Sequence, residues 1–178
     1  MTDLARVLAE GNVRLEPFAD AHVEGLRAAC ALDREIWQIY PFNMVGDDFD
    51  RQLRTLAAFA NWVRFAAIDT DTDRVVGMTS YIDPDKWGVT EIGATYLSPD
   101  MRGTGFNGTM KRLMIDNAFA HGFRRIEFRI DTRNTRSMAA VEKLGARHEG
   151  TLRQNRITWT GYVRDTAIYG LMREEWAG

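Results

Sequence analysis

Cysteine, long apolar runs and an excess of basic residues are all lacking in this sequence, and each absence excludes a class of protein. Cys30 is the only cysteine, so neither an intramolecular disulfide nor a cysteine metal cluster can form. With 23 basic against 25 acidic residues the net charge is −2, which argues against nucleic acid as a partner. No apolar run approaches the length of a membrane span, and residues 1–11 lack a signal-peptide core. We therefore expect no membrane association and a cytoplasmic protein.

What the sequence does contain is the composition of an ordinary globular protein. Of its 178 residues, 45% are hydrophobic and 27% are charged, which is sufficient for one sizeable core. It has no repeats, low-complexity segments or linkers, so we expect residues 1–178 to form a single domain. The three histidines are scattered and lack the spacing of metal ligands, so we predict no metal site.

The strongest local signal lies between Tyr96 and Gly122. A β-rich run, Val89–Leu97, is broken at Pro99, and three glycines follow it: Gly103, Gly105 and Gly108. Helical spacing then begins, with apolar residues at Met110, Leu113, Met114 and Ala118. The first turn of a helix has unpaired N–H groups, and glycines let a bulky anion approach the backbone. This stretch therefore predicts a phosphate-binding loop between a strand and a helix.

Two phosphate motifs fit this glycine spacing. Gly103-x-Gly105-x-x-Gly108 matches the dinucleotide fingerprint, with Asp131 as a ribose ligand. Several strands precede the motif, however, and residues 98–102 separate it from the nearest one. The same residues also read as Arg102-x-x-Gly105-x-Asn107, in which an arginine precedes the loop. The dinucleotide-binding domain remains the main alternative.

The remaining pattern predicts a mixed α+β chain. Alternating apolar residues predict strands over Asn12–Glu16, Trp62–Ile68 and Ile126–Ile130. Polar turns bound two further strands, Val75–Ile82 and Val89–Leu97, and a final hairpin is predicted over Arg147–Ile157 and Tyr162–Met172, turned near Thr160 and Gly161. Helical patterns begin at Asp20, at Asp47 or Asp50, at Met110 and at Asn134, and Gly145 ends the last of them. Short polar turns join the strands between residues 62 and 97, which favours an antiparallel meander. The helix after the glycines implies that Ile126–Ile130 runs parallel to Val89–Leu97.

A second motif, Asn134-x-x-Ser137 followed by Glu142-Lys143-Leu144-Gly145, accompanies the first. Together with Arg102-x-x-Gly105-x-Asn107 and the element order, it resembles the GNAT superfamily of N-acetyltransferases, and within it the ribosomal-protein-alanine (RimJ/RimL-like) branch. The resemblance extends over roughly Val13–Trp176, and Asn107 departs from the small residue usual at its position. It implies a mostly antiparallel sheet of six to seven strands with about four helices, splayed between two central parallel strands.

The resemblance also implies acetyl-CoA as the cofactor and a primary amine as the acceptor, either a peptide N-terminal α-amine or a small amine. A homodimer is one assembly that the sequence allows. The implied cofactor-binding residues are Tyr96, Leu97, Arg102, Gly103, Thr104, Gly105, Phe106, Asn107, Gly108, Asn134, Ser137 and Lys143. A backbone N–H near Leu97 is expected to stabilise the oxyanion that forms during acyl transfer.

For catalysis, Glu91 is the candidate base, although a structural strand carboxylate would look the same in the sequence. The tyrosine acid of many relatives would fall near Val141, and Ser137 is its expected substitute here. Because that tyrosine is missing, a non-catalytic acyl-CoA-binding module is a second alternative.

The aromatic residues of two segments are candidates for the acceptor pocket. The candidates are Trp37, Tyr40, Phe42, Trp159 and Tyr162, and core filling is the competing interpretation for the first three. The acidic residues Asp47, Asp48 and Asp50 could bind a polycation, so a polyamine remains an alternative acceptor.

Overall fold

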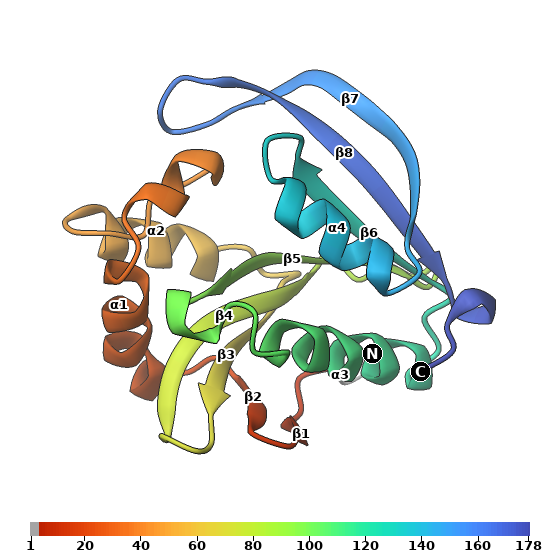
Figure 1. Ribbon diagram of the computed structural model, residues 1–178, viewed down its shortest axis with the longest axis horizontal. Helices are drawn as coiled ribbons and strands as arrows, with labels where there is room; N and C mark the ends of the chain where they lie inside the picture. Colours follow the sequence, from red (N-terminus) through yellow and green to blue (C-terminus); the bar gives the residue numbers. More distant parts are fainter. Residues whose placement is uncertain (1–3) are drawn as a thin grey trace.

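The computed structural model describes residues 4–178, so the first three residues of the expected single domain lie outside the described residues. One eight-stranded sheet runs through this part of the chain, in the order β1-β2-β3-β4-β5-β6-β8-β7 (Figure 1). Its strands are β1 Leu8–Glu10, β2 Val13–Pro17, β3 Val63–Asp69, β4 Arg74–Ile82, β5 Val89–Leu97, β6 Arg125–Asp131, β7 Arg147–Ile157 and β8 Val163–Met172. The α-helices are α1 Val23–Ala31, α2 Asp48–Ala57, α3 Phe106–Ala120 and α4 Thr135–Lys143. Short 3₁₀ turns cover Asp20–His22, Glu35–Ile39, Pro99–Met101 and Arg173–Glu175.

The predicted α+β fold, mostly antiparallel and with four α-helices among the described residues, is confirmed. The predicted strand number was too low, because residues 4–178 form eight strands rather than six or seven. The extra strand is β1, which pairs with β2 from Leu8↔Leu15 to Glu10↔Val13. Three residues are too few to show an alternating pattern, so only the partner strand identifies this one. No described helix has the length and apolarity needed to cross a membrane.

β5 and β6 are parallel, as the intervening helix predicted, but they separate soon after they meet. Their pairs are Val89↔Arg125, Thr90↔Ile126 and Glu91↔Glu127, and none follows. Beyond Glu91 the register of β5 with β4 shifts, and Ala94 has a φ of +48°. Such a bulge bends a strand and turns its side chains. The sheet therefore opens where β5 leaves β6.

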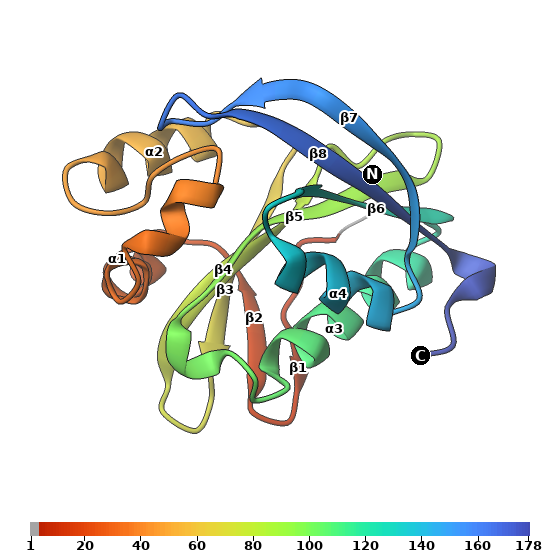
Figure 2. The ribbon, with the colours of Figure 1, turned by 45° about the horizontal axis from the view of Figure 1, so that its top comes forward.

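The helices cover both faces of the sheet (Figures 1 and 2). On one face α3 and α4 pack over a core that contains Phe106, Met110, Met114, Val141, Tyr81 and Phe128. On the other, α1 and α2 pack over a second core that contains Leu26, Ala29, Phe49, Leu56, Met78 and Tyr96. The opening between β5 and β6 thus lies between two separately packed layers.

Two helix starts differ from the prediction. Asp20 does not cap a helix, because it begins a 3₁₀ turn whose N-cap is Ala19, and α1 starts only at Val23. α3 starts at Phe106, before the predicted Met110, with Gly105 as its N-cap residue. The glycine loop is therefore shorter than predicted and leads directly into the first turn of α3.

Candidate active site

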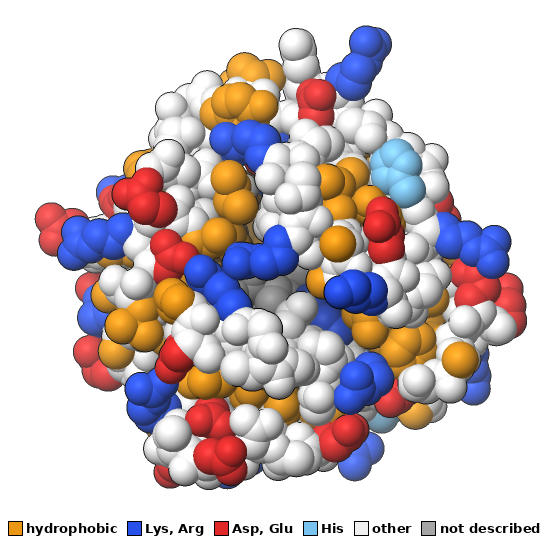
Figure 3. Space-filling model, in the orientation of Figure 1, with side chains coloured by type: hydrophobic (Ala, Val, Ile, Leu, Met, Phe, Trp, Pro, Cys, Tyr) orange, Lys and Arg blue, Asp and Glu red, His pale blue; other side chains and the backbone are white. Residues whose placement is uncertain are grey.

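A cavity of about 970 Å³ lies where β5 and β6 separate. From the α3 and α4 side it is lined by Asn107, Lys111, Asn134, Ser137 and Val141. From the opposite side it is lined by Phe59, Trp62, Glu91, Glu127, Arg129, Asp131, Arg156 and Arg164. The molecule is hollowed near the centre of the face seen in Figure 3, and Lys and Arg side chains surround the hollow. The lining residues show that one cavity reaches both sides of the sheet.

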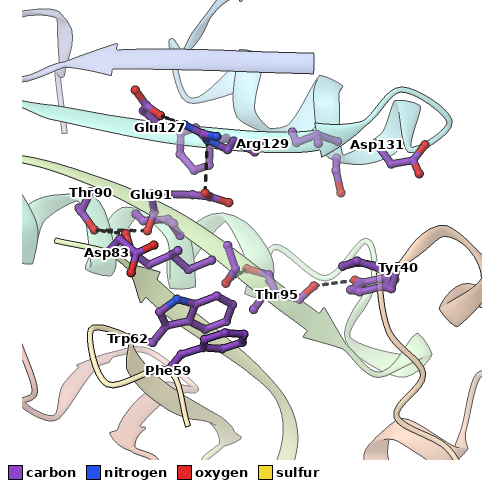
Figure 4. A pocket seen from close by; sticks show the side chains of 18 of the residues that line it. Tyr40, Phe59, Trp62, Asp83, Thr90, Glu91, Thr95, Glu127, Arg129 and Asp131 are labelled. Atoms are coloured by element: carbon purple, nitrogen blue, oxygen red, sulfur yellow. Dashed lines mark hydrogen bonds and ion pairs between the residues drawn. The ribbon is translucent and has the colours of Figure 1, made fainter. Parts of the chain in front are cut away.

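Glu91 lies at the last pair between β5 and β6, and its side chain is only 17% exposed. Burial raises the pKa of this carboxyl to about 7, and the nearby Arg129 opposes the rise. Arg129 Nε lies 3.6 Å from Glu91 Oε2, and Figure 4 shows the two side chains pointing toward each other across the gap. A carboxyl with a pKa near neutrality can exchange a proton at physiological pH.

Glu127 faces Glu91 directly across the parallel pair, so two carboxylates share one side of the opening. Glu127 is held by Arg125 at 3.0 Å and by Arg129 at 3.2 Å. Its negative charge also raises the pKa of Glu91. Arg129 therefore bridges the two acids, and Glu127 is the better paired of them.

Lys111 of α3 is a residue that sequence reasoning did not assign to the site. It is only 6% exposed, lines the cavity, and donates from Nζ to Thr95 Oγ1 at 2.7 Å. Its Nζ also lies 5.8 Å from the centre of the Phe128 ring. Burial lowers its pKa from the ordinary 10.5 to about 7, and Glu91 opposes the fall. Lys111 follows Asn107 by one helical turn, and that spacing could have indicated a shared face.

Of the five predicted acceptor-pocket residues, the structure brings Tyr40 and Phe42 to the cavity. Tyr40 donates its hydroxyl to the Thr95 carbonyl at 2.6 Å, which holds it against β5. Trp37 is fully buried and stacks on Tyr96 with ring centres 4.7 Å apart, so it fills the core behind the cavity.

Trp159 and Tyr162 lie at the tip of the β7–β8 hairpin and do not line the cavity. The aromatic lining comes instead from Phe59 and Trp62, which stack with centres 4.7 Å apart (Figure 4). These two lie between α2 and β3 with a spacing of three residues, and sequence reasoning did not assign them to the site.

The glycine loop is open to approach. Gly103 and Gly105 have φ values of +79° and +90°, and a Cβ added at either would meet nothing within 4 Å. In the described part of the chain the amides of Gly103, Thr104, Gly105, Asn107 and Gly108 have no acceptor. Phe106 is buried and anchors the first turn of α3 in the core. A row of free amides at a helix N-terminus is suited to a phosphate group.

Arg102 and the other predicted cofactor residues are placed in different ways. The Arg102 guanidinium donates to Asp33 at 2.5 Å and to the Leu97 carbonyl at 3.3 Å, so its charge is already paired. Tyr96 and Leu97 are buried and do not line the cavity, and Lys143 is exposed at the end of α4.

Asn134 is the N-cap of α4, and its Oδ1 accepts from the Ser137 N–H at 3.1 Å. Both residues line the cavity, and the Ser137 hydroxyl has no partner among residues 4–178. Val141, the position near which the resemblance led us to look for a tyrosine, lines the same wall one turn later. Ser137 is thus a free hydroxyl that faces the opening.

Comparison with known proteins is consistent with this geometry. A family model described as an acetyltransferase (GNAT) domain matches residues 12–147. No curated protein matches the chain. A solved structure of a GNAT-family protein from Chromobacterium violaceum is 29% identical, with a TM-score of 0.90 over 98% of this chain and 89% of that one. A GCN5-related N-acetyltransferase from Brucella melitensis is 27% identical, with a TM-score of 0.88 over 97% of this chain and 80% of that one.

Two more distant structures show the shared fold alone. A spermidine N-acetyltransferase from Vibrio cholerae, solved with CoA and spermine, is 15% identical with a TM-score of 0.77, over 95% of this chain and 100% of that one. A ribosomal-protein-S5-alanine acetyltransferase from Vibrio fischeri is 17% identical with a TM-score of 0.72, over 97% of this chain and 100% of that one.

Proposed function

Because the chain belongs to the GNAT family of acetyltransferases, we propose that it is an N-acetyltransferase that moves the acetyl group of acetyl-CoA directly to a primary amine. Residues 1–178 would form one acyl-CoA N-acyltransferase domain. The observation that carries the proposal is the cavity between β5 and β6, which reaches both faces of the sheet and contains Glu91. A donor and an acceptor could therefore enter from opposite sides and meet beside a buried carboxylate.

The α3 and α4 side fits a CoA thioester. The free amides from Gly103 to Gly108 would hold the pyrophosphate, and Asn107, Asn134 and Ser137 line the adjoining cavity. Arg102 would act by fixing the loop through Asp33 and Leu97 rather than by its net charge. Acetyl-CoA, when bound, supplies the acetyl group as an activated thioester.

In the transfer, a carbon–nitrogen bond forms while the carbon–sulfur bond breaks. Glu91 would take the proton from the amine, through a water molecule, since its pKa of about 7 suits a general base at neutral pH. Backbone N–H groups of β5 near Leu97, beyond its last pair with β6, would stabilise the charge that develops on the carbonyl oxygen. The unpartnered Ser137 hydroxyl would give a proton to the departing thiolate and recover one from water.

For the acceptor, we propose an α-amine, as in the RimJ/RimL-like branch. An α-amine with a pKa of about 7.7–8.0 is partly neutral at pH 7, whereas a lysine or polyamine amine is almost fully protonated. The stacked Phe59–Trp62 pair supports an acceptor with an apolar group beside the amine.

The test is acetyl transfer with purified protein, followed by thiol release and by mass spectrometry of the product. We expect acetyl-CoA to raise the melting temperature and at least one α-amine to be acetylated. Binding of acetyl-CoA without transfer to any peptide, amino-acid or polyamine amine would favour a non-catalytic module. A larger thermal shift with NAD(P) than with acetyl-CoA would favour a dinucleotide-binding domain.

A further inference from the structure

Two arginines of the β7–β8 hairpin lie side by side on the cavity. Arg156 of β7 is the direct cross-strand partner of Arg164 of β8, and both line the cavity. A register shift between Leu152 and Arg156 produces this pairing, and Gln154 within it has a φ of +51°. Like charges in direct opposition destabilise a sheet. A bulge that nevertheless places two arginines in direct opposition on the cavity favours an anion as their ligand.

The neighbouring carboxylates Glu91 and Asp131 form their ion pairs with other arginines, Arg129 and Arg133. Among residues 4–178 neither Arg156 nor Arg164 forms an ion pair, and the only hydrogen bond of either side chain runs from Arg164 Nε to Thr166 Oγ1 at 2.9 Å. Asp131, whose charge acts on Arg164, is bound by Arg133 at 2.7 Å. Arg164 is only 5% exposed, and burial lowers its pKa; the charge of Arg156 adds to this fall, and the charges of Asp131 and Glu91 oppose it. A buried guanidinium that forms no ion pair of its own is suited to binding an anion.

The arginine pair lies on the same face of the sheet as Glu91. Residues directly opposite in a sheet point to the same side, and every second residue of a strand does so too. Glu91 pairs with Glu127, and Asp131, four residues further on β6, pairs with Thr166. Arg164 is two residues from Thr166. The pair is therefore on the acceptor side of the cavity, away from the glycine loop.

We propose that Arg156 and Arg164 bind a carboxylate of the acceptor, so that the substrate is a small amine that itself carries a carboxylate, such as an α-amino acid. This rests on the proposed function, since it describes the acceptor of that same site. Arginine is suited to this role because its planar fork of N–H donors matches a carboxylate in two-point contact. A polyamine offers no group for this pair, and its charges would be repelled.

The experiment compares L-phenylalanine and L-leucine with their carboxamides, and with spermidine, at saturating acetyl-CoA and over a range of pH that corrects for amine ionisation. Arg156→Gln is the main variant, because Arg156 is exposed and its loss should not affect folding. Arg164→Gln is the second. Arg153→Gln is the matched control: Arg153 is an exposed residue of the same strand, outside the cavity, with no hydrogen bond or ion pair among the described residues.

We expect the wild type to prefer the amino acids, and Arg156→Gln to raise their KM by about tenfold to a hundredfold, the scale of hydrogen bonds to charged groups. The carboxamides should be unaffected, and Arg153→Gln should behave as wild type. The carboxylate site would be overturned if the ratio of the KM for an amino acid to the KM for its carboxamide were the same in both cavity variants as in the wild type. A wild-type preference for the carboxamides or for spermidine would also overturn it.

Calorimetry keeps this test separate from that of the proposed function. If no amine is acetylated at all, the proposed function fails, and binding of L-phenylalanine and N-acetyl-L-phenylalanine is then measured directly. Binding that is lost in Arg156→Gln and kept in Arg153→Gln would still support the carboxylate site. Absence of binding to the wild type would exclude it.

Discussion

At the scale of single residues, the buried Glu91 determines how the proposed reaction depends on pH. Burial raises its pKa to about 7, so the carboxylate that can accept a proton is lost as the pH falls through that value. We expect wild-type kcat/KM to fall on the acidic side of about pH 7. Glu91→Gln should lower kcat about 10²–10⁴-fold, as is usual for a general base, and should remove the dependence on this ionisation. The pH–rate profiles of the wild type and of Glu91→Gln measure these effects.

Glu127 provides the matched control for this prediction. It is the same residue type, directly opposite Glu91, and its charge raises the pKa of Glu91. Glu127→Gln should therefore keep most of the activity and move the acidic limb to lower pH. If Glu91→Gln retains full activity while Glu127→Gln loses it, the two carboxylates have been assigned the wrong way round.

Lys111 gives a prediction about stability. Its pKa is lowered from 10.5 to about 7 in the folded protein, so between these values the unfolded chain binds a proton that the folded chain does not. Stability must then rise with pH in that window, by up to about 1.4 kcal/mol per pH unit for one proton. Lys111→Met should flatten this rise. Urea unfolding of both proteins from about pH 7 to 9 measures it, and parallel curves would show that the buried amine is not responsible.

At the scale of elements, the glycine loop and the first turn of α3 form the proposed pyrophosphate seat. Gly105→Asp adds a negative charge beside the free amides, and we expect the affinity for acetyl-CoA to fall at least about tenfold, from lost charge-assisted hydrogen bonds of roughly 1.5–3 kcal/mol. Because Gly105 has a φ of +90°, any side chain there adds strain. Gly105→Ala carries that strain without the charge and should lose much less affinity. Calorimetry with equal affinities for both variants would contradict the charge argument.

The elements themselves were largely predictable from the sequence, whereas their junctions were not. β5 and β7 begin and end where the sequence predicted them, at Val89–Leu97 and Arg147–Ile157. β5 was recognisable from its apolar, β-rich run and the break at Pro99. β7, in which no residue is buried, was recognisable from the turn near Thr160 and Gly161 that joins it to the last strand. β1 was not predicted, because the only feature that identifies it as a strand is its pairing with β2.

The candidate site could be predicted in part, because Tyr40 and Phe42 were also expected at the acceptor pocket and line the cavity. Glu91, Asn107, Asn134 and Ser137 were named from the sequence and line the cavity. Lys111 was missed because a lysine beside a narrow apolar stripe has the pattern of an exposed residue. Arg156 and Arg164 are cross-strand partners because of a shift in register between β7 and β8, and no local sequence pattern specifies that shift.

At the scale of the whole molecule, the β7–β8 hairpin extends beyond the sheet at one side of the cavity and contacts the segment that follows α1. It reaches from β6 towards the segment that follows α1 (Figures 1 and 2). Trp159 Nε1 donates to the Trp37 carbonyl at 2.7 Å. The Tyr162 ring lies 3.7 Å from the Arg133 guanidinium, and Arg133 donates to the Gln38 carbonyl at 3.4 Å. The hairpin tip is thus fastened to the Trp37–Gln38 segment at two points.

This arrangement gives Trp159 a role that differs from the pocket lining predicted for it, and a single substitution separates the two. Trp159→Phe keeps an aromatic ring but removes the N–H donor that holds the hairpin tip to Trp37. If fastening is its role, the variant should lose about 1 kcal/mol of unfolding free energy, the usual net value of one hydrogen bond. Faster amide exchange at the hairpin tip and a higher KM for the acceptor should accompany that loss.

Tyr162→Phe is the matched control, because the Tyr162 ring stays over Arg133 and its hydroxyl has no partner within the described residues. This variant should resemble the wild type in amide exchange, stability and KM. If Trp159→Phe is equally silent in all three, the hydrogen bond to Trp37 does not fasten the hairpin. The position of Arg156 and Arg164 beside Glu91 would then depend on the pairing of β8 with β6 and on the contact between Tyr162 and Arg133, which both remain in that variant.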